Sequence, residues 1–170
     1  NFNGLAAVET PEFLASVKDK LGTVDAYNHY SVGWAWAMCA PYQWTKQVAS
    51  HWGGTRNGAI VHWPAGITAN GEVRSQFTHV IDVAPSVLEA AGIPEPLFVN
   101  GVQQAPIEGT SFAYTFDATR AKASSRHKTQ YFEMMGQWAL YDDGWMLSTK
   151  VNRAPWDAFG PANPDPLNKQ

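Results

Sequence analysis

The spacing of apolar residues predicts a short helix near the start of the chain. Thr10 is a good N-cap and Pro11 suits the first turn, where its missing N–H has no cost. Apolar residues then recur at a spacing of four, and Gly22 ends the pattern; they are Phe13, Val17 and Leu21.

A second helix is predicted from Asp82, which is its N-cap. Pro85 falls in the first turn, and Gly92 followed by Pro94 closes the helix. The apolar face is formed by Val87, Leu88 and Ala91. Asp82 is therefore interpreted as a helix cap rather than as a metal ligand.

Other apolar runs have the length and composition of strands. Ala59–Trp63, between Gly58 and Pro64, predicts a buried strand. Three runs at 129–134, 138–141 and 145–149 predict an antiparallel meander. Asp142-Asp143-Gly144 gives the turn between the last two, which argues against a metal site there.

The remaining segments predict little regular structure. Residues 27–54 are aromatic and show no clean period, although Gln43–Ser50 could form a helical turn or two before Gly53-Gly54. Residues 94–116 are predicted to be a loop, with turns at Asn100-Gly101 and Gly109. Residues 152–170 contain four prolines and predict an irregular tail.

Composition limits the class of protein. A chain of 170 residues with 45% hydrophobic and 16% charged residues is globular and holds one domain, or one and a fragment. The net charge of −3 and the lack of a basic stripe argue against nucleic acid as a partner. A single cysteine excludes an internal disulfide. No run approaches the length of a membrane span or has the blocks of a signal peptide, so any targeting signal of a parent protein lies outside this chain, and its compartment is not indicated.

The candidate for chemistry is Lys46, which stands among Tyr42, Trp44 and Trp52. An ammonium group in a partly desolvated aromatic pocket acts more strongly on an anion than it would in water. The alternative is a surface lysine whose stem packs on an indole.

A resemblance favours the first interpretation. The chain is similar to bacterial arylsulfatases, which are formylglycine-dependent sulfatases, in blocks that span nearly its whole length. They lie at 27–30, 33–38, 40–46, 53–56, 61–64, 76–82, 85–93, 99–101, 113–116, 130–134 and 143–145.

The resemblance implies an alkaline-phosphatase-like α/β fold with a large mixed sheet and a small antiparallel C-terminal subdomain. It implies hydrolysis of sulfate esters by a formylglycine nucleophile with bound calcium, and a sulfate-contacting lysine that Lys46 matches. On this basis 1–122 is the C-terminal part of the large domain, 123–151 forms strands of the subdomain, and 152–170 is the tail.

Departures from the family pattern limit what this chain can do alone. The formylglycine motif is Cys-x-Pro-Ser-Arg, whereas here Cys39 begins Cys-Ala-Pro-Tyr-Gln, so Cys39 is expected to be an inert thiol. Many sulfatases have Glu-Gly-Gly after this lysine, whereas this chain has His51-Trp52-Gly53-Gly54, with one extra residue. His51 could therefore line the substrate pocket, or it could be a structural or solvated histidine. The metal ligands of the family are absent, so no metal site is predicted in this chain, which we expect to be an inactive fragment.

Two other functions remain open at this point. The Trp-rich region 34–63 could form an aromatic platform that binds carbohydrate or another partner. The same fold could also belong to a phosphatase or phosphonate hydrolase. A fragment of a larger sheet would expose apolar surface near Ile60–Trp63, so we expect self-association or docking on the missing portion.

Overall fold

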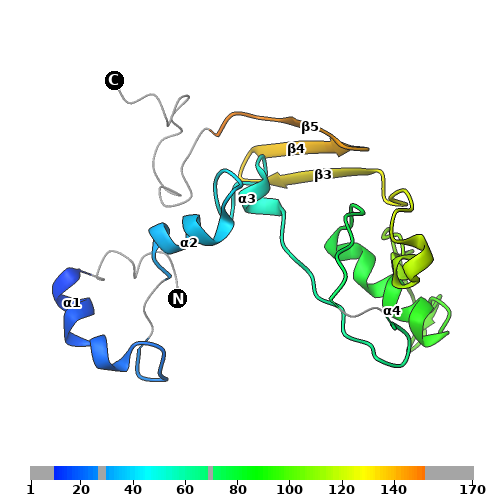
Figure 1. Ribbon diagram of the computed structural model, residues 1–170, viewed down its shortest axis with the longest axis horizontal. Coiled ribbons are helices and arrows are strands. Elements are labelled where there is room, and N and C mark those ends of the chain that lie inside the picture. Colours follow the sequence, from blue (N-terminus) through cyan, green and yellow to red (C-terminus); the bar gives the residue numbers. More distant parts are fainter. Residues whose placement is uncertain (1–9, 27–29, 69–70, 152–170) are drawn as a thin grey trace. The chain divides into compact units, whose positions relative to one another are not determined.

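The computed structural model describes residues 10–26, 30–68 and 71–151 (Figure 1). These residues divide into two compact units. Unit 1 holds the described residues up to Arg56, Phe132–Ala139 and the described residues from Ser148 on; unit 2 holds Asn57–Tyr131 and Leu140–Leu147. The boundary between the units crosses the strands near the C-terminal end. The predicted irregular tail, 152–170, lies outside the described residues.

The first helix, α1 (Pro11–Ser16), begins as predicted. The Thr10 hydroxyl accepts a hydrogen bond from the Phe13 N–H at 3.2 Å. The helix ends earlier than the apolar spacing suggested, because a 3-10 turn, η2 (Lys18–Lys20), follows it. Its apolar stripe is not buried by the described residues, since Phe13 and Leu21 are both exposed.

The second helix, α2 (Val32–Cys39), is not predicted by the spacing of apolar residues. The Ser31 hydroxyl lies 3.5 Å from the Trp34 N–H and caps its start. The helix has no polar side chain, so it lacks the apolar and polar alternation at period 3.6 that identifies an amphipathic helix. A uniformly apolar helix gives no such signal.

The predicted helical turns at Gln43–Ser50 are wrong. Trp44 and Gln47 have φ of 67° and 76°, which a right-handed helix does not allow. The helix instead lies at α3 (Trp52–Thr55) and includes both Gly53 and Gly54.

Unit 2 contains the predicted second helix, α4 (Val83–Ala91), preceded by the 3-10 turn η3 (Val80–Asp82). Gly92 ends α4 in the left-handed region at φ 67°, with its N–H donating to the Glu89 carbonyl, as expected for a glycine C-cap. Asp82 is at the N-cap position as predicted, but its side chain does not cap α4.

Residues 94–116 are more ordered than predicted. Asn100 and Gly101, both at positive φ, form the expected turn, and it joins β1 (Phe98–Val99) to β2 (Val102–Gln103) in an antiparallel pair. The 3-10 turns η4 (Ala113–Phe116) and η5 (Ala118–Arg120) follow.

The predicted meander is confirmed. Strands β3 (Thr129–Met134), β4 (Gln137–Asp142) and β5 (Trp145–Ser148) form one sheet in this order and lie side by side in Figure 1. Two-residue turns join them. Asp143 and Gly144 have the predicted positive φ, and Met135 and Gly136 form an equivalent turn before β4.

The predicted buried strand at Ala59–Trp63 is wrong. These residues form no strand in the described part of the chain, and Ile60 is 97% exposed. β-branched residues favour a strand chiefly through pairing and burial on a sheet, and the described residues supply no partner strand here. The expected apolar exposure of this segment is nevertheless present.

The buried core is small. Trp44, Val48 and Val151 form a hydrophobic cluster in unit 1. Many large apolar side chains are exposed in both units, including Trp34, Val87 and Phe98. Among the described residues, no helix has both the length and the apolar composition required to cross a bilayer.

Candidate functional site

The candidate site is the loop that carries Lys46, and its backbone has an unusual conformation. The two non-glycine residues that flank Thr45-Lys46, Trp44 and Gln47, both lie in the left-handed region. Such residues cost about 1–3 kcal/mol each and persist only where surrounding contacts fix them. Strained positions of this kind cluster at functional sites.

The double glycine of α3 supplies those contacts. The Gly53 N–H donates to the Gln43 carbonyl at 3.0 Å. A Cβ at Gly53 would overlap the Trp44 carbonyl, and a Cβ at Gly54 would overlap the Val48 carbonyl. Only glycine therefore lets the loop backbone lie this close to the helix.

Burial fixes the side chains on either side of Lys46. Trp44 is 6% exposed and packs with fully buried Val48, while Thr45 is also buried. Lys46 itself is exposed. The loop therefore presents one ammonium group to solvent from an anchored backbone.

The aromatic pocket predicted around Lys46 is not what the structure shows. A different cation lies on the predicted rings: the Arg56 guanidinium carbon is 5.0 Å from the Tyr42 ring centroid and 5.6 Å from that of Trp52. Trp44 belongs to the hydrophobic core instead. The sulfate contact assigned to Lys46 stays a prediction. The exposed Lys46 ammonium group does not have the desolvated surroundings that were expected.

His51 lies close to this loop and is half-buried. Its Nδ1 is 2.8 Å from the Ser50 hydroxyl oxygen, and its ring meets Trp44 edge to face at 6.4 Å. Burial lowers the pKa of His51 from its ordinary value of 6.5, because the charged imidazolium loses hydration. His51 is therefore neutral at pH 7 and can exchange a hydrogen bond without adding charge. Its predicted place in a substrate pocket stays a prediction.

The described residues provide neither the nucleophile motif nor the metal site of the sulfatase family. Cys39 is a free, half-buried thiol at the end of α2. In the described ranges, no group of three or more His, Cys, Asp or Glu side chains could hold a metal ion. The donor set needed for calcium is thus not met by these residues.

Asp143 lies in the predicted turn before Gly144, and both aspartates also contact residues at the start of β3. The Thr129 hydroxyl donates to Asp142 at 2.7 Å, and Lys128 donates to Asp143 at 2.7 Å. Both carboxylates therefore join the ends of β3 and β4.

A buried network in unit 2 was not foreseen from the sequence. Asp82 is fully buried, and its carboxylate accepts hydrogen bonds from the His79 and Thr110 N–H groups, each at 2.7 Å. The two carboxylate oxygens also lie 2.8 and 2.9 Å from Nδ1 of His127. Asp82 thus connects three segments that are distant in sequence.

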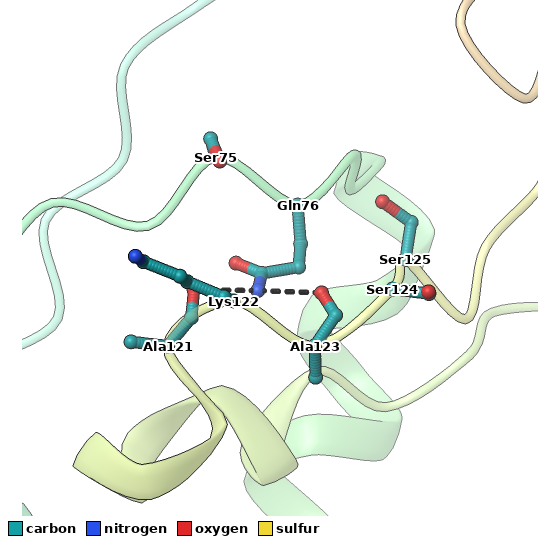
Figure 2. Close-up of a pocket in the computed structure, with 7 residues that line it drawn as sticks. All are labelled: Ser75, Gln76, Ala121, Lys122, Ala123, Ser124 and Ser125. Carbon is teal, nitrogen blue, oxygen red and sulfur yellow. Dashed lines mark hydrogen bonds between the residues drawn. The ribbon is translucent and has the colours of Figure 1, made fainter.

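Unit 2 also has a shallow polar hollow of about 310 Å³, shown in Figure 2. The Gln76 amide nitrogen donates to the carbonyls of Ala121 and Ala123, at 3.0 and 2.9 Å. Lys122 and three serines complete the lining, and none of the predicted site residues contributes to it.

Comparison with known proteins agrees with the sequence resemblance over part of the chain. Residues 25–93 match the sulfatase family. The matched segment contains the Lys46 loop, the double glycine and α4. This segment is similar to part of a sulfatase domain.

The similarity to one relative covers only a small part of that protein. Over 78 residues the chain is 32% identical to an uncharacterized sulfatase of Schizosaccharomyces pombe, covering 46% of this chain and 14% of that protein. The chain therefore matches about a seventh of the relative's length.

The matched segment has a charge pattern that the spacing of apolar residues does not reveal. Between Asp25 and Glu72 the sequence has no Asp or Glu, and its two permanent cations are Lys46 and Arg56. This stretch is therefore positive in a chain of net charge −3. Counting charges by segment would have pointed to Arg56 as well as to Lys46.

Proposed function

We propose that this chain is part of an arylsulfatase-type enzyme that hydrolyses sulfate esters, and that Lys46 contacts the sulfate group. The observation that carries the proposal is the family match over 25–93, which includes the exposed Lys46 and the double glycine that holds its loop. His51, beside the same loop, lines the substrate pocket in this proposal.

The chemistry of the proposed role is electrostatic. Sulfuryl transfer places negative charge on the sulfate oxygens, and a fixed cation beside them stabilises that charge without having to reorganise. The anchored backbone around Lys46 supplies the fixed position. The neutral His51 adds a hydrogen-bonding group without competing for the anion.

The remaining parts of the enzyme belong to other portions of the parent protein in this proposal. They are the formylglycine nucleophile and the calcium ligands, which the described residues do not supply. The division into a large-domain part, 1–122, and strands of a small subdomain, 123–151, is part of the same proposal. The chain alone is then inactive and needs the rest of the domain as its partner.

The test is the turnover of p-nitrophenyl sulfate by the parent enzyme that carries this segment. Lys46→Ala should lower kcat by about 10²–10³, the usual cost of removing one transition-state contact. Lys150→Ala is the matched control, since Lys150 is also exposed but lies outside the matched segment. Equal turnover by wild type and Lys46→Ala would exclude the proposed contact.

The open alternatives are separated by the choice of substrate and ligand. Trp34 and Trp36 are 67% and 48% exposed, which favours the aromatic binding surface as a second candidate. Trp36 and Trp44, however, are tilted by 36° and do not form a flat platform. Binding of unsulfated oligosaccharides would support that candidate, and faster turnover of p-nitrophenyl phosphate than of the sulfate would favour a phosphatase.

A further inference from the structure

Arg56 is held in a defined orientation by two aromatic rings. It follows α3 directly, and its N–H donates to the Trp52 carbonyl at 2.7 Å. Its guanidinium lies over the rings of Tyr42 and Trp52. Aromatic contact at the flat face of a guanidinium restricts its motion and leaves the N–H groups at its edge available for hydrogen bonds.

No carboxylate in the described residues neutralises this cation. The ion pairs of the described residues involve other cations, and the sequence from Ala26 to Gly71 contains no acidic residue. An exposed arginine without an acidic neighbour retains its full attraction for an external anion. A planar guanidinium also matches two oxygens of an oxyanion at once.

Arg56 and Lys46 belong to one continuous piece of structure. Gln43 and Trp44 lie against Gly53, and Val48 lies against Gly54, so the Lys46 loop and the helix that ends at Arg56 pack directly on each other. Both cations are exposed on this loop and helix.

We propose that Arg56 is a second oxyanion-binding residue of the Lys46 site. This inference rests on the proposed function and specifies how the substrate is bound. Two cations, Lys46 and Arg56, bind the sulfate ester. Arg56 contacts either the same sulfate as Lys46 or a second anionic group of the substrate. Tyr42 and Trp52 act as positioning residues for Arg56.

The experiment uses the whole chain and two non-hydrolysable probes, benzenesulfonate and benzene-1,3-disulfonate, titrated by calorimetry at constant ionic strength. Arg56→Gln should weaken disulfonate binding by about fivefold or more, since a hydrogen bond to a charged group is lost. Arg56→Lys, which keeps the charge but not the planar fork, should restore part of the affinity. The near-ultraviolet circular dichroism of the tryptophans verifies that each variant is folded.

The two probes separate the two sources of the anion. Equal weakening of both probes by Arg56→Gln means that Arg56 and Lys46 share one oxyanion. Weakening of the disulfonate alone means that Arg56 takes a second anionic group. If Arg56→Gln changes neither affinity, or if Arg56→Lys restores none of the loss, the inference is overturned.

A double-mutant cycle tests the role of the rings. Trp52→Leu should weaken binding in the wild-type background and have no further effect in Arg56→Gln, because its contribution passes through Arg56. Additive losses would contradict the positioning role.

Lys46→Gln distinguishes failure of this inference from failure of the proposed function. Loss of binding in Lys46→Gln with none in Arg56→Gln overturns only the role of Arg56. Loss of binding in Arg56→Gln with none in Lys46→Gln supports Arg56 as an anion-binding residue and removes the support for Lys46. Absence of binding by the wild-type chain overturns the inference, while the proposed function is still judged by turnover in the parent enzyme.

Discussion

Asp82 is a buried residue on which we expect the stability of unit 2 to depend. Its carboxylate is fully buried and accepts from two backbone N–H groups while facing His127. Asp82→Asn removes the charge and turns an amide N–H₂ toward groups that donate. A buried donor left without its acceptor typically costs about 1–3 kcal/mol, so we expect a decrease of at least this size in the free energy of unfolding.

Urea denaturation measures that loss, and Asp143→Asn is its control. Asp143 also contacts a basic side chain, Lys128, but the Asp143 side chain is 62% exposed. An exposed pair contributes about 0–1 kcal/mol, so the control should change stability little. Equal decreases in the free energy of unfolding for the two substitutions would contradict the prediction, because the buried carboxylate would then contribute no more to stability than the exposed one.

His51 gives the stability of unit 1 a dependence on pH. Burial lowers its pKa in the folded state below the ordinary 6.5, so the unfolded chain binds the proton more readily. Stability is therefore complete above 6.5 and decreases as the pH falls through 6.5 toward the folded pKa. Between pH 7.5 and 5.5, the wild type should lose more stability than His51→Gln.

This comparison isolates His51 from other titrating groups. His79 also has a pKa lowered by burial, an effect that the charge of Asp82 opposes, and it titrates in both proteins. Parallel pH profiles for wild type and His51→Gln, measured by chemical denaturation, would contradict the prediction.

Among the elements, α3 is the most sensitive to the addition of a single methyl group. Gly53→Ala places a Cβ against the Trp44 carbonyl, which belongs to the backbone and cannot rotate away. We expect a loss of about 1–3 kcal/mol, typical of overpacking, together with displacement of the Lys46 loop.

Gly33→Ala is the matched control for this substitution. Gly33 also lies in a helix, α2, but a Cβ there meets nothing within 4 Å. Alanine in a helix is about 0.5–1 kcal/mol more favourable than glycine, so the control should be neutral or stabilising. Thermal melts of the two variants should therefore shift in opposite directions, and equal shifts would exclude the close approach.

The elements that could be predicted from the sequence are those whose signals are local. Thr10, Gly92 and the Asp143-Gly144 turn act within a few residues, and the structure has α1, α4 and the meander where these signals place them. The element α2 has no polar face to reveal it. At α3, glycines that normally end helices are required by contact with another segment.

The candidate site could be predicted only in part for a similar reason. Lys46 could be predicted as a site residue because the sequence around it resembles bacterial arylsulfatases. The contact of Arg56 with Tyr42 depends on the fold of the intervening loop, which no local period encodes. The positive φ of Trp44 and Gln47 likewise results from packing against α3 and is not expected from residue type.

At the scale of the whole molecule, exposed apolar surface is the main feature still to be accounted for. Val80, Val83 and Val87 lie three and four residues apart near α4 and are each about half exposed or more. In the proposed parent enzyme, we expect other segments to cover this face.

Without that partner, the chain should self-associate through the same face. Sedimentation velocity should show species larger than the monomer at micromolar concentrations. Val83→Lys combined with Val87→Lys should shift the distribution toward monomer with little change in fold stability, because both side chains are exposed. A wild-type chain that remains monomeric would contradict this prediction.

The Asp82 network has a consequence for the order in which the protein is made. Asp82 leaves the ribosome 45 residues before His127 does. At ordinary synthesis rates this interval lasts roughly 2–9 seconds, during which the nascent helix α4 carries a carboxylate whose imidazole partner does not yet exist. The buried network around Asp82 can therefore form only after His127 has emerged from the exit tunnel.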